Sequence, residues 1–112
     1  MHEVALATQL AAVVRRAARG RRVESVSIEV GALRQVVPES LEFAWTFVNK
    51  GTTIAGAALA VTWVPGRLQC PAGHVAEFSG EFSVLCPICG QRGAIIDGEQ
   101  FRVLSIDVLT GS

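Results

Sequence analysis

The chain has 112 residues, half of them hydrophobic, and its ten Lys and Arg residues balance its ten Asp and Glu residues. This length predicts a single domain, or a small domain that carries a metal-stabilised lobe, and the zero net charge gives no electrostatic preference for nucleic acid or anionic lipid. No apolar stretch approaches the roughly 20 residues of a membrane span, and the N-terminus does not resemble a signal peptide, so we expect a cytoplasmic protein with no nucleic-acid or membrane partner.

The first predicted element is an amphipathic helix from Val4 to about Arg19. Apolar residues recur along it at helical spacing, and Gly20 follows its end. The end of this helix carries a run of arginines: Arg15, Arg16, Arg19, Arg21 and Arg22. We interpret the run as a solvated helix end, because no aromatic residues are interleaved with the arginines. Contact with phosphate or with an acidic partner surface remains the alternative.

Three strands and a second helix follow. Residues 26–30 and 59–63 alternate apolar and polar side chains, as half-buried strands do, and residues 101–109 predict a last strand. Between the first two strands, Pro38 suits the first turn of a second helix that ends before Gly51. The order predicts an α+β fold, in which two helices pack on a small three-stranded sheet with an inserted zinc-ribbon-like lobe. We expect residues 1–65 plus 95–112 to form the α/β domain and residues 66–94 to form the lobe.

The lobe concentrates the metal-binding side chains of the chain. It holds all three cysteines and one of the two histidines: Cys70, His74, Cys86 and Cys89. The motif Cys86-x-x-Cys89, followed by a glycine, is typical of half of a structural zinc site. The first half is irregular, because Gly73 occupies the place of a second cysteine and His74 follows it. We therefore predict zinc bound by these four side chains, with water or an outside group in the place of His74 as the alternative.

Other chemistry is compatible with the same lobe. A Cys-x-x-Cys pair also occurs in dithiol oxidoreductases, but there it stands at the start of a helix, and these flanks are short and glycine-rich. A zinc bound only by three thiolates would leave an open position for hydrolysis, but three thiolates quench the Lewis acidity of the metal. We therefore expect no enzyme. A zinc-ribbon module that binds nucleic acid or protein remains the alternative function.

The amino terminus predicts a second, looser metal site. The free amine of Met1, the backbone nitrogen of His2 and its imidazole can form fused chelate rings around one cation, and Glu3 could add an oxygen or its own backbone nitrogen. Nitrogen donors of this planar kind suit Ni(II) or Cu(II). Taken alone, a histidine beside the first methionine is most often a solvated residue, so this pattern by itself leaves both interpretations open.

Several segments together resemble a known family. They are Met1-His2-Glu3, Glu29-Val30-Gly31-Ala32-Leu33, Val37-Pro38-Glu39-Ser40-Leu41, Gly51-Thr52, Gly56-Ala57 and the late cysteine lobe. Their combination and order are similar to those of the HypA/HybF hydrogenase nickel-insertion accessory proteins, over essentially the whole chain.

The resemblance implies a nickel metallochaperone for the maturation of [NiFe]-hydrogenase, with some family members serving urease. It implies transient Ni(II) bound through Met1, His2 and Glu3, and structural Zn(II) in the lobe. The implied partners are a maturation GTPase and the precursor of the hydrogenase large subunit, with the chain itself a monomer or weak homodimer. The family has two Cys-x-x-Cys pairs in its zinc site, so Gly73-His74 puts the fourth ligand of this chain in question.

Overall fold

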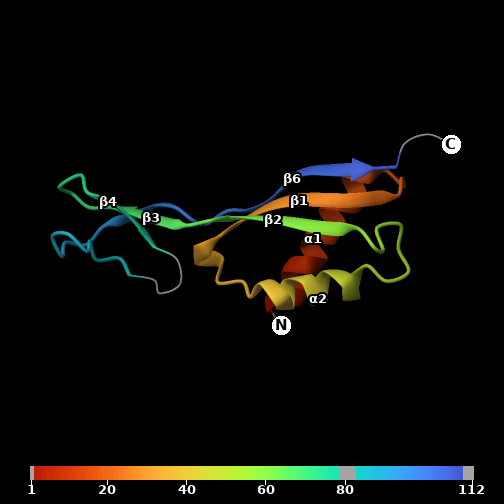
Figure 1. Cartoon of the computed structure of the whole chain (residues 1–112), viewed down its shortest axis with the longest axis horizontal. Helices are drawn as coiled ribbons and strands as arrows, with labels where there is room; N and C mark the ends of the chain where they lie inside the picture. The colour runs from red at the N-terminus through yellow and green to blue at the C-terminus, as the bar shows by residue number, and fades with distance from the viewer. Residues whose placement is uncertain (1, 79–82, 110–112) are drawn as a thin grey trace. The chain divides into compact units, whose positions relative to one another are not determined.

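The computed structural model describes residues 2–78 and 83–109, and of His2 it describes the backbone alone. Both α-helices lie in the first half of this part of the chain, and the elements after α2 are all strands (Figure 1). In chain order the elements are α1 (His2–Ala18), β1 (Val23–Gly31), the 3-10 helix η1 (Ala32–Arg34), α2 (Pro38–Val48), β2 (Ala58–Val64), β3 (Gly66–Gln69), β4 (Val75–Phe78), β5 (Ala94–Asp97) and β6 (Phe101–Val108). Within the described residues, no helix is long and apolar enough to cross a membrane.

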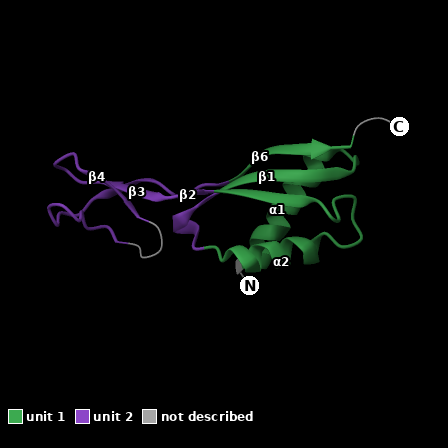
Figure 2. Ribbon diagram, in the orientation of Figure 1, with its two compact units in different colours: residues 1–29, 36–62, 102–112 green, residues 30–35, 63–101 purple. Residues whose placement is uncertain are grey.

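The chain divides into two compact units (Figure 2). The first unit comprises residues 1–29, 36–62 and 102–112, and the second comprises residues 30–35 and 63–101. The second unit therefore includes residues 30–35, 63–65 and 95–101, which the sequence assigned to the α/β domain. The boundaries expected from the sequence, residues 1–65 plus 95–112 and residues 66–94, stay a prediction.

The first unit is built on a three-stranded sheet with the strand order β2-β1-β6. The burial of alternate residues in β1 gives that strand one buried side, as the period of two in the sequence predicted. Helices α1 and α2 pack against each other, and their apolar faces close the core. This core contains Leu6, Ala7, Leu10, Ala11, Val14 and Ala18 of α1, Val23, Val26 and Ile28 of β1, and Leu41, Ala44 and Trp45 of α2. The predicted α+β fold with two helices and a small sheet is confirmed.

Two polar contacts fix side chains in the first unit. The Trp45 indole Nε1 donates a hydrogen bond of 2.9 Å to the carbonyl of Ala57, so the polar edge of this buried ring has a partner. On β1 and β6, Glu29 and Arg102 form an ion pair of 2.7 Å. Because Arg102 is largely exposed, this pair contributes little to stability.

The second unit contains a sheet that the sequence did not predict. Its strand order is β4-β3-β5, and β3 pairs with both neighbours in antiparallel fashion. Each of these strands has four residues, which is too short for an alternating pattern to be distinguished from a loop. The core of this unit is small and consists of Leu68, Cys70 and Cys86, with Ala76, Phe78 and Ile95 packed against it.

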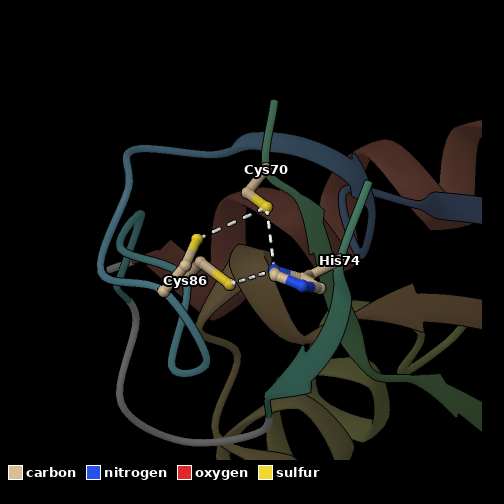
Figure 3. A group of neighbouring side chains, drawn as sticks. Cys70, His74 and Cys86 are labelled. Atoms are coloured by element: carbon tan, nitrogen blue, oxygen red, sulfur yellow. Dashed lines mark hydrogen bonds between the residues drawn. The ribbon is translucent and has the colours of Figure 1, made fainter. Parts of the chain in front are cut away.

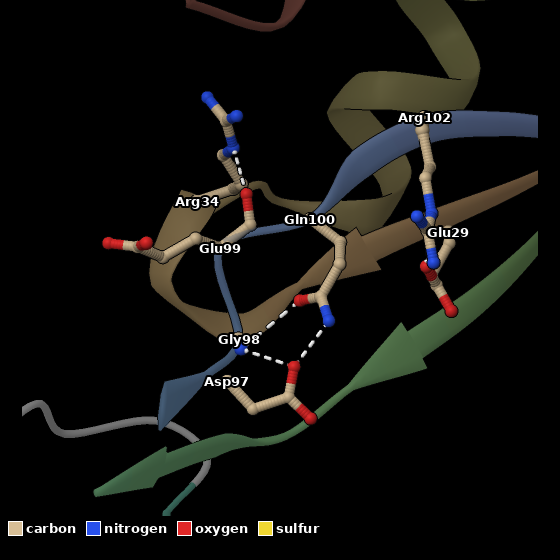
Figure 4. A network of polar contacts seen from close by, with 7 residues as sticks. All are labelled: Glu29, Arg34, Asp97, Gly98, Glu99, Gln100 and Arg102. Carbon is tan, nitrogen blue, oxygen red and sulfur yellow. Dashed lines mark hydrogen bonds and ion pairs between the residues drawn. The ribbon is translucent and has the colours of Figure 1, made fainter. Parts of the chain in front are cut away.

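The second unit also contains η1, which the sequence reasoning missed. The amide of Gly31 donates to the carbonyl of Gln100 at 2.7 Å, and the amide of Leu33 donates to the carbonyl of Gly98 at 2.9 Å. Gly98 itself has a φ of +109°, and its amide donates to the side chains of Asp97 and Gln100 (Figure 4). The Asp97-Gly98 turn expected before the last strand therefore also anchors the segment that follows β1.

Candidate metal centre

Four side chains from two separate turns of the second unit converge at one end of its sheet. Cys70 Sγ lies 3.4 Å from His74 Nδ1 and 3.7 Å from Cys89 Sγ, and Cys86 Sγ lies 3.8 Å from the same histidine nitrogen (Figure 3). All four potential ligand atoms lie within 4.8 Å of one another. The structure therefore brings together the complete set of zinc candidates from the sequence: Cys70, His74, Cys86 and Cys89.

A tight turn between β3 and β4 positions the first two of these side chains. The amide of Gly73 donates to the carbonyl of Cys70 at 2.9 Å, and the amide of Cys70 donates to the carbonyl of His74 at 3.0 Å. Gly73 has a φ of +92°, a conformation that side chains with a Cβ rarely adopt. This left-handed residue turns the chain so that the imidazole of His74 reaches back to the sulfur of Cys70.

A second turn presents the other two sulfurs. The amide of Gly90 donates to the carbonyl of Cys86, and the amide of Cys86 donates to the carbonyl of Gln91, both at 2.8 Å. Gly90 has a φ of +76°, which matches the role that the sequence gave to the glycine after Cys89. The pair lies in a turn and not at the start of a helix, which argues against a dithiol redox motif.

The spacing of the four ligand atoms fits a tetrahedral zinc ion. With Zn–S bonds of about 2.3 Å and Zn–N bonds of about 2.0–2.1 Å, tetrahedral geometry separates two sulfurs by about 3.8 Å and a sulfur from a nitrogen by about 3.6 Å. The four side chains supply three sulfurs and one nitrogen. The Cys70–His74, Cys86–His74 and Cys70–Cys89 distances of 3.4, 3.8 and 3.7 Å are close to these values, and all four atoms lie within 4.8 Å of one another. Donors of this type select zinc over magnesium or calcium, which prefer oxygen.

The pKa values of two of the thiols are shifted in opposite directions by their surroundings. The backbone amide of Cys89, followed by that of Ile88, lowers the pKa of Cys86 from 9.0 to about 6. For Cys89, the backbone amide of Gln91 lowers the pKa, but desolvation and the neighbouring thiols of Cys70 and Cys86 raise it overall. One thiolate therefore forms readily at neutral pH, whereas further negative charge in the cluster needs a compensating cation.

The structure describes the predicted nickel site only in part. Met1 lies outside the described residues, and His2 is the first residue of α1. Glu3 is in the first turn of α1, and its Oε2 accepts a hydrogen bond of 3.3 Å from the amide of Val37. The sequence gave no signal for this contact, because it joins residues 34 positions apart.

Comparisons with known proteins agree with one another. The sequence model of the family described as "Hydrogenase/urease nickel incorporation, metallochaperone, hypA" matches residues 1–108. The chain is 36% identical to the hydrogenase maturation factor HypA of Geobacter metallireducens over 110 residues, which cover 96% of this chain and 99% of that protein. It is 35% identical to the protein of the same name from Geobacter sulfurreducens over 109 residues, with the same coverage.

Two solved structures share the fold. The solution structure of the Ni metallochaperone HypA from Helicobacter pylori matches with a TM-score of 0.68 and 20% identity, covering 99% of this chain and 100% of that one. A second solution structure of a HypA protein matches with a TM-score of 0.66 and 21% identity, covering 97% of each chain. At these identities the structural likeness supports the fold alone.

Proposed function

Because the chain belongs to the HypA family of hydrogenase and urease nickel-incorporation metallochaperones, we propose that it binds Ni(II) at its N-terminus and delivers it for the maturation of [NiFe]-hydrogenase. The proposed nickel ligands are Met1, His2 and Glu3, and nickel is cargo that leaves the protein. The observation that carries the proposal is the presence of Met1-His2-Glu3 at the start of a chain that matches the family model over residues 1–108.

The start of α1 is a suitable place for such a chelate. The first four amides of an α-helix have no carbonyl partner within the helix, so the backbone nitrogens of His2 and Glu3 are not committed to helical hydrogen bonds. Metal coordination by these nitrogens therefore breaks no helical bond. A chelate of amine, amide and imidazole nitrogens also suits Ni(II) better than it suits tetrahedral Zn(II).

The four side chains of the second unit have a different task in this proposal. Cys70, His74, Cys86 and Cys89 hold structural Zn(II), with His74 Nδ1 as the fourth ligand. Zinc binding by small domains supplies about 10–16 kcal/mol of apparent free energy to the folded state. The core of this unit consists of a few apolar side chains around Cys70 and Cys86, so we expect the metal to hold its sheet together.

The proposal includes partners and a location. The chain works in the cytoplasm with a maturation GTPase and with the precursor of the hydrogenase large subunit, and urease is a second possible recipient of the nickel. It catalyses no reaction itself and acts as a monomer or weak homodimer. Nucleic acid has no place in this function, because the chain has no net charge.

The variant His2→Ala tests the nickel site. It removes the imidazole while leaving the backbone nitrogens, so we expect calorimetric titration with Ni(II) to show loss of high-affinity binding. Zinc content and the far-UV circular dichroism spectrum should stay as in the wild type, because the zinc ligands lie in the other unit. Undiminished nickel affinity in the variant would refute the proposed site.

Two further measurements sharpen this test. Residues placed ahead of Met1 convert the free amine into an amide, so an N-terminal extension should also weaken nickel binding, even though every side chain is kept. As a matched control, His74→Ala should leave the nickel affinity unchanged while it reduces zinc content. A loss of nickel binding in both histidine variants would indicate that nickel occupies the lobe instead.

A further inference from the structure

The outer face of α2 presents a row of side chains that nothing covers among the described residues. Glu39, Phe43 and Phe47 are spaced four residues apart, so they follow one another along one face of the helix over about 12 Å. Phe43 is 74% exposed and Phe47 is 58% exposed. The opposite face holds Leu41, Ala44 and Trp45, which are buried in the core, so the exposed phenylalanines are not needed to hold the helix in place.

Two adjacent exposed aromatic rings on a helix of 11 residues are unusual for a surface with no binding role. Single apolar side chains scattered over a surface are normal, but neighbouring ones form a patch that favours association. A buried phenylalanine side chain contributes about 150–250 Å² of contact, and aromatic residues are enriched at the centres of protein interfaces. Phe43 and Phe47 could therefore form the centre of a small interface.

The negative charge of Glu39 and Glu42 indicates what kind of partner surface would be complementary to this face of α2. Glu39 and Glu42 are both exposed, and α2 contains no basic residue. A complementary surface accordingly combines an apolar groove for the two rings with basic side chains around the end that faces these carboxylates. The two glutamates disfavour nucleic acids and anionic lipid surfaces, because both carry negative charge that these carboxylates would repel.

The row begins beside the end of the chain that is proposed to carry nickel. Glu3 Oε2 accepts a hydrogen bond from the amide of Val37, which is the N-cap residue of α2, and Glu39 is two residues further on. Both segments belong to the same compact unit. A protein that docks along Glu39, Phe43 and Phe47 is therefore brought next to residues 2 and 3.

We propose that the exposed face of α2 is the docking surface for a protein that exchanges nickel with the N-terminus, and that this protein presents an apolar groove with a basic rim. This inference rests on the proposed function, because it takes the nickel site to be at Met1, His2 and Glu3. Docking along α2 places the metal site of the partner near the chelate, which shortens the path of a cation that must not be released into solution.

The double variant Phe43→Gln/Phe47→Gln tests the docking surface. Its zinc-loaded, nickel-free form is compared with the wild type in binding to the purified maturation GTPase and to the purified hydrogenase large-subunit precursor. We expect at least a tenfold loss of affinity for one of the two proteins. The control Val13→Gln/Leu104→Gln removes two other half-exposed apolar side chains from the same unit and should bind as the wild type does.

The charge requirement is tested separately with Glu39→Lys/Glu42→Lys. We expect this variant to lose affinity for the same partner and to show a weaker dependence of binding on salt concentration. The control Glu24→Lys on β1 should show neither change.

Unchanged binding of both double variants to both proteins would overturn the proposal. A change confined to self-association, measured by light scattering, would also overturn it, because the face would then join two copies of this chain. The proposal would also be overturned if the wild-type protein bound neither of the two proteins.

Partner binding and nickel binding are measured separately, so a failure of the docking surface can be distinguished from a failure of the nickel site. Phe43→Gln/Phe47→Gln should titrate with Ni(II) as the wild type does, because neither phenylalanine is a proposed nickel ligand. If His2→Ala keeps its nickel affinity while the α2 variants lose partner binding, the proposed nickel site fails and the docking surface stands. If His2→Ala loses its nickel affinity while the α2 variants bind the partner as the wild type does, the nickel site is supported and the docking surface is refuted.

Discussion

At the scale of single residues, the lobe is informative because it departs from the two Cys-x-x-Cys pairs that the family resemblance implies. A regular Cys-x-x-Cys pair would place a sulfur at position 73, where this chain has a glycine with a φ of +92°. The following His74 brings Nδ1 to 3.4 Å from Cys70 Sγ. The turn at Gly73 and the longer reach of the imidazole together bring this nitrogen close to the sulfur.

The variant His74→Ala tests this fourth donor. Only three thiols would remain, so we expect zinc affinity to fall by more than about 100-fold, given that loss of a group that merely supports a ligand costs about 10–100-fold. Competition with a chromophoric chelator measures the affinity. Gln69→Ala, an exposed change in β3 beside Cys70, should keep it unchanged. Full zinc affinity in His74→Ala would show that the histidine is not a ligand.

At the scale of elements, three glycines allow backbones to approach closely in the second unit. A Cβ at Gly31 would overlap the carbonyl of Gly98, and a Cβ at Gly98 would lie 2.6 Å from the Cα of Gly66. These contacts bring together the end of β1, the start of β3 and the turn before β6. Gly31 itself has an extended backbone, with φ −84° and ψ 149°, so the close approach and not the conformation requires a glycine there.

The variant Gly31→Ala should therefore destabilise the protein. The added methyl group meets backbone atoms, which cannot move aside as a flexible side chain can, so we expect a loss of about 3 kcal/mol in the free energy of unfolding. Urea titration followed by circular dichroism measures it. Gly20→Ala, whose methyl group meets nothing within 4 Å at a φ of +82°, isolates the conformational cost of about 1–2 kcal/mol. Equal losses in both variants would contradict the proposed clash.

At the scale of the whole molecule, the two units have different sources of stability. The first unit has a core drawn from both helices and β1, whereas the core of the second is confined to a few side chains around the cysteines. The first can be stabilised by apolar burial, as an ordinary small domain is. The second resembles domains that fold only when their metal is bound.

Removal of zinc with a chelator should accordingly affect one unit more than the other. We expect amides in β3, β4 and β5 to lose protection from hydrogen exchange, because the metal no longer joins the two turns that carry the ligands. Amides in the middle of α1 and α2 should stay protected. Mass spectrometry of peptides measures both regions in one sample. Persistent protection of β3 in the metal-free protein would show that the small sheet is stable by itself.

The sequence by itself determined the elements whose signals are local. The helical period in residues 4–19, the alternation around Ile28 and the proline at position 38 each depend on neighbours in the chain, and the structure confirms the α+β fold that they predict. The same holds for family membership, since the ordered motifs are spread over the whole chain and the family model matches residues 1–108. The zinc candidates could also be named in advance, because few side chains of the lobe bind soft cations.

Only the tertiary structure decided how distant residues meet. It places His74 Nδ1 among three sulfurs, pairs the four-residue strands of the lobe, and joins the Glu3 carboxylate to the amide of Val37. These contacts depend on turns with positive φ and on the packing of segments tens of residues apart, for which a short stretch of sequence has no periodic signal. The proximity of His74 to the three sulfurs and of Glu3 to the start of α2 could therefore be seen only in the folded chain.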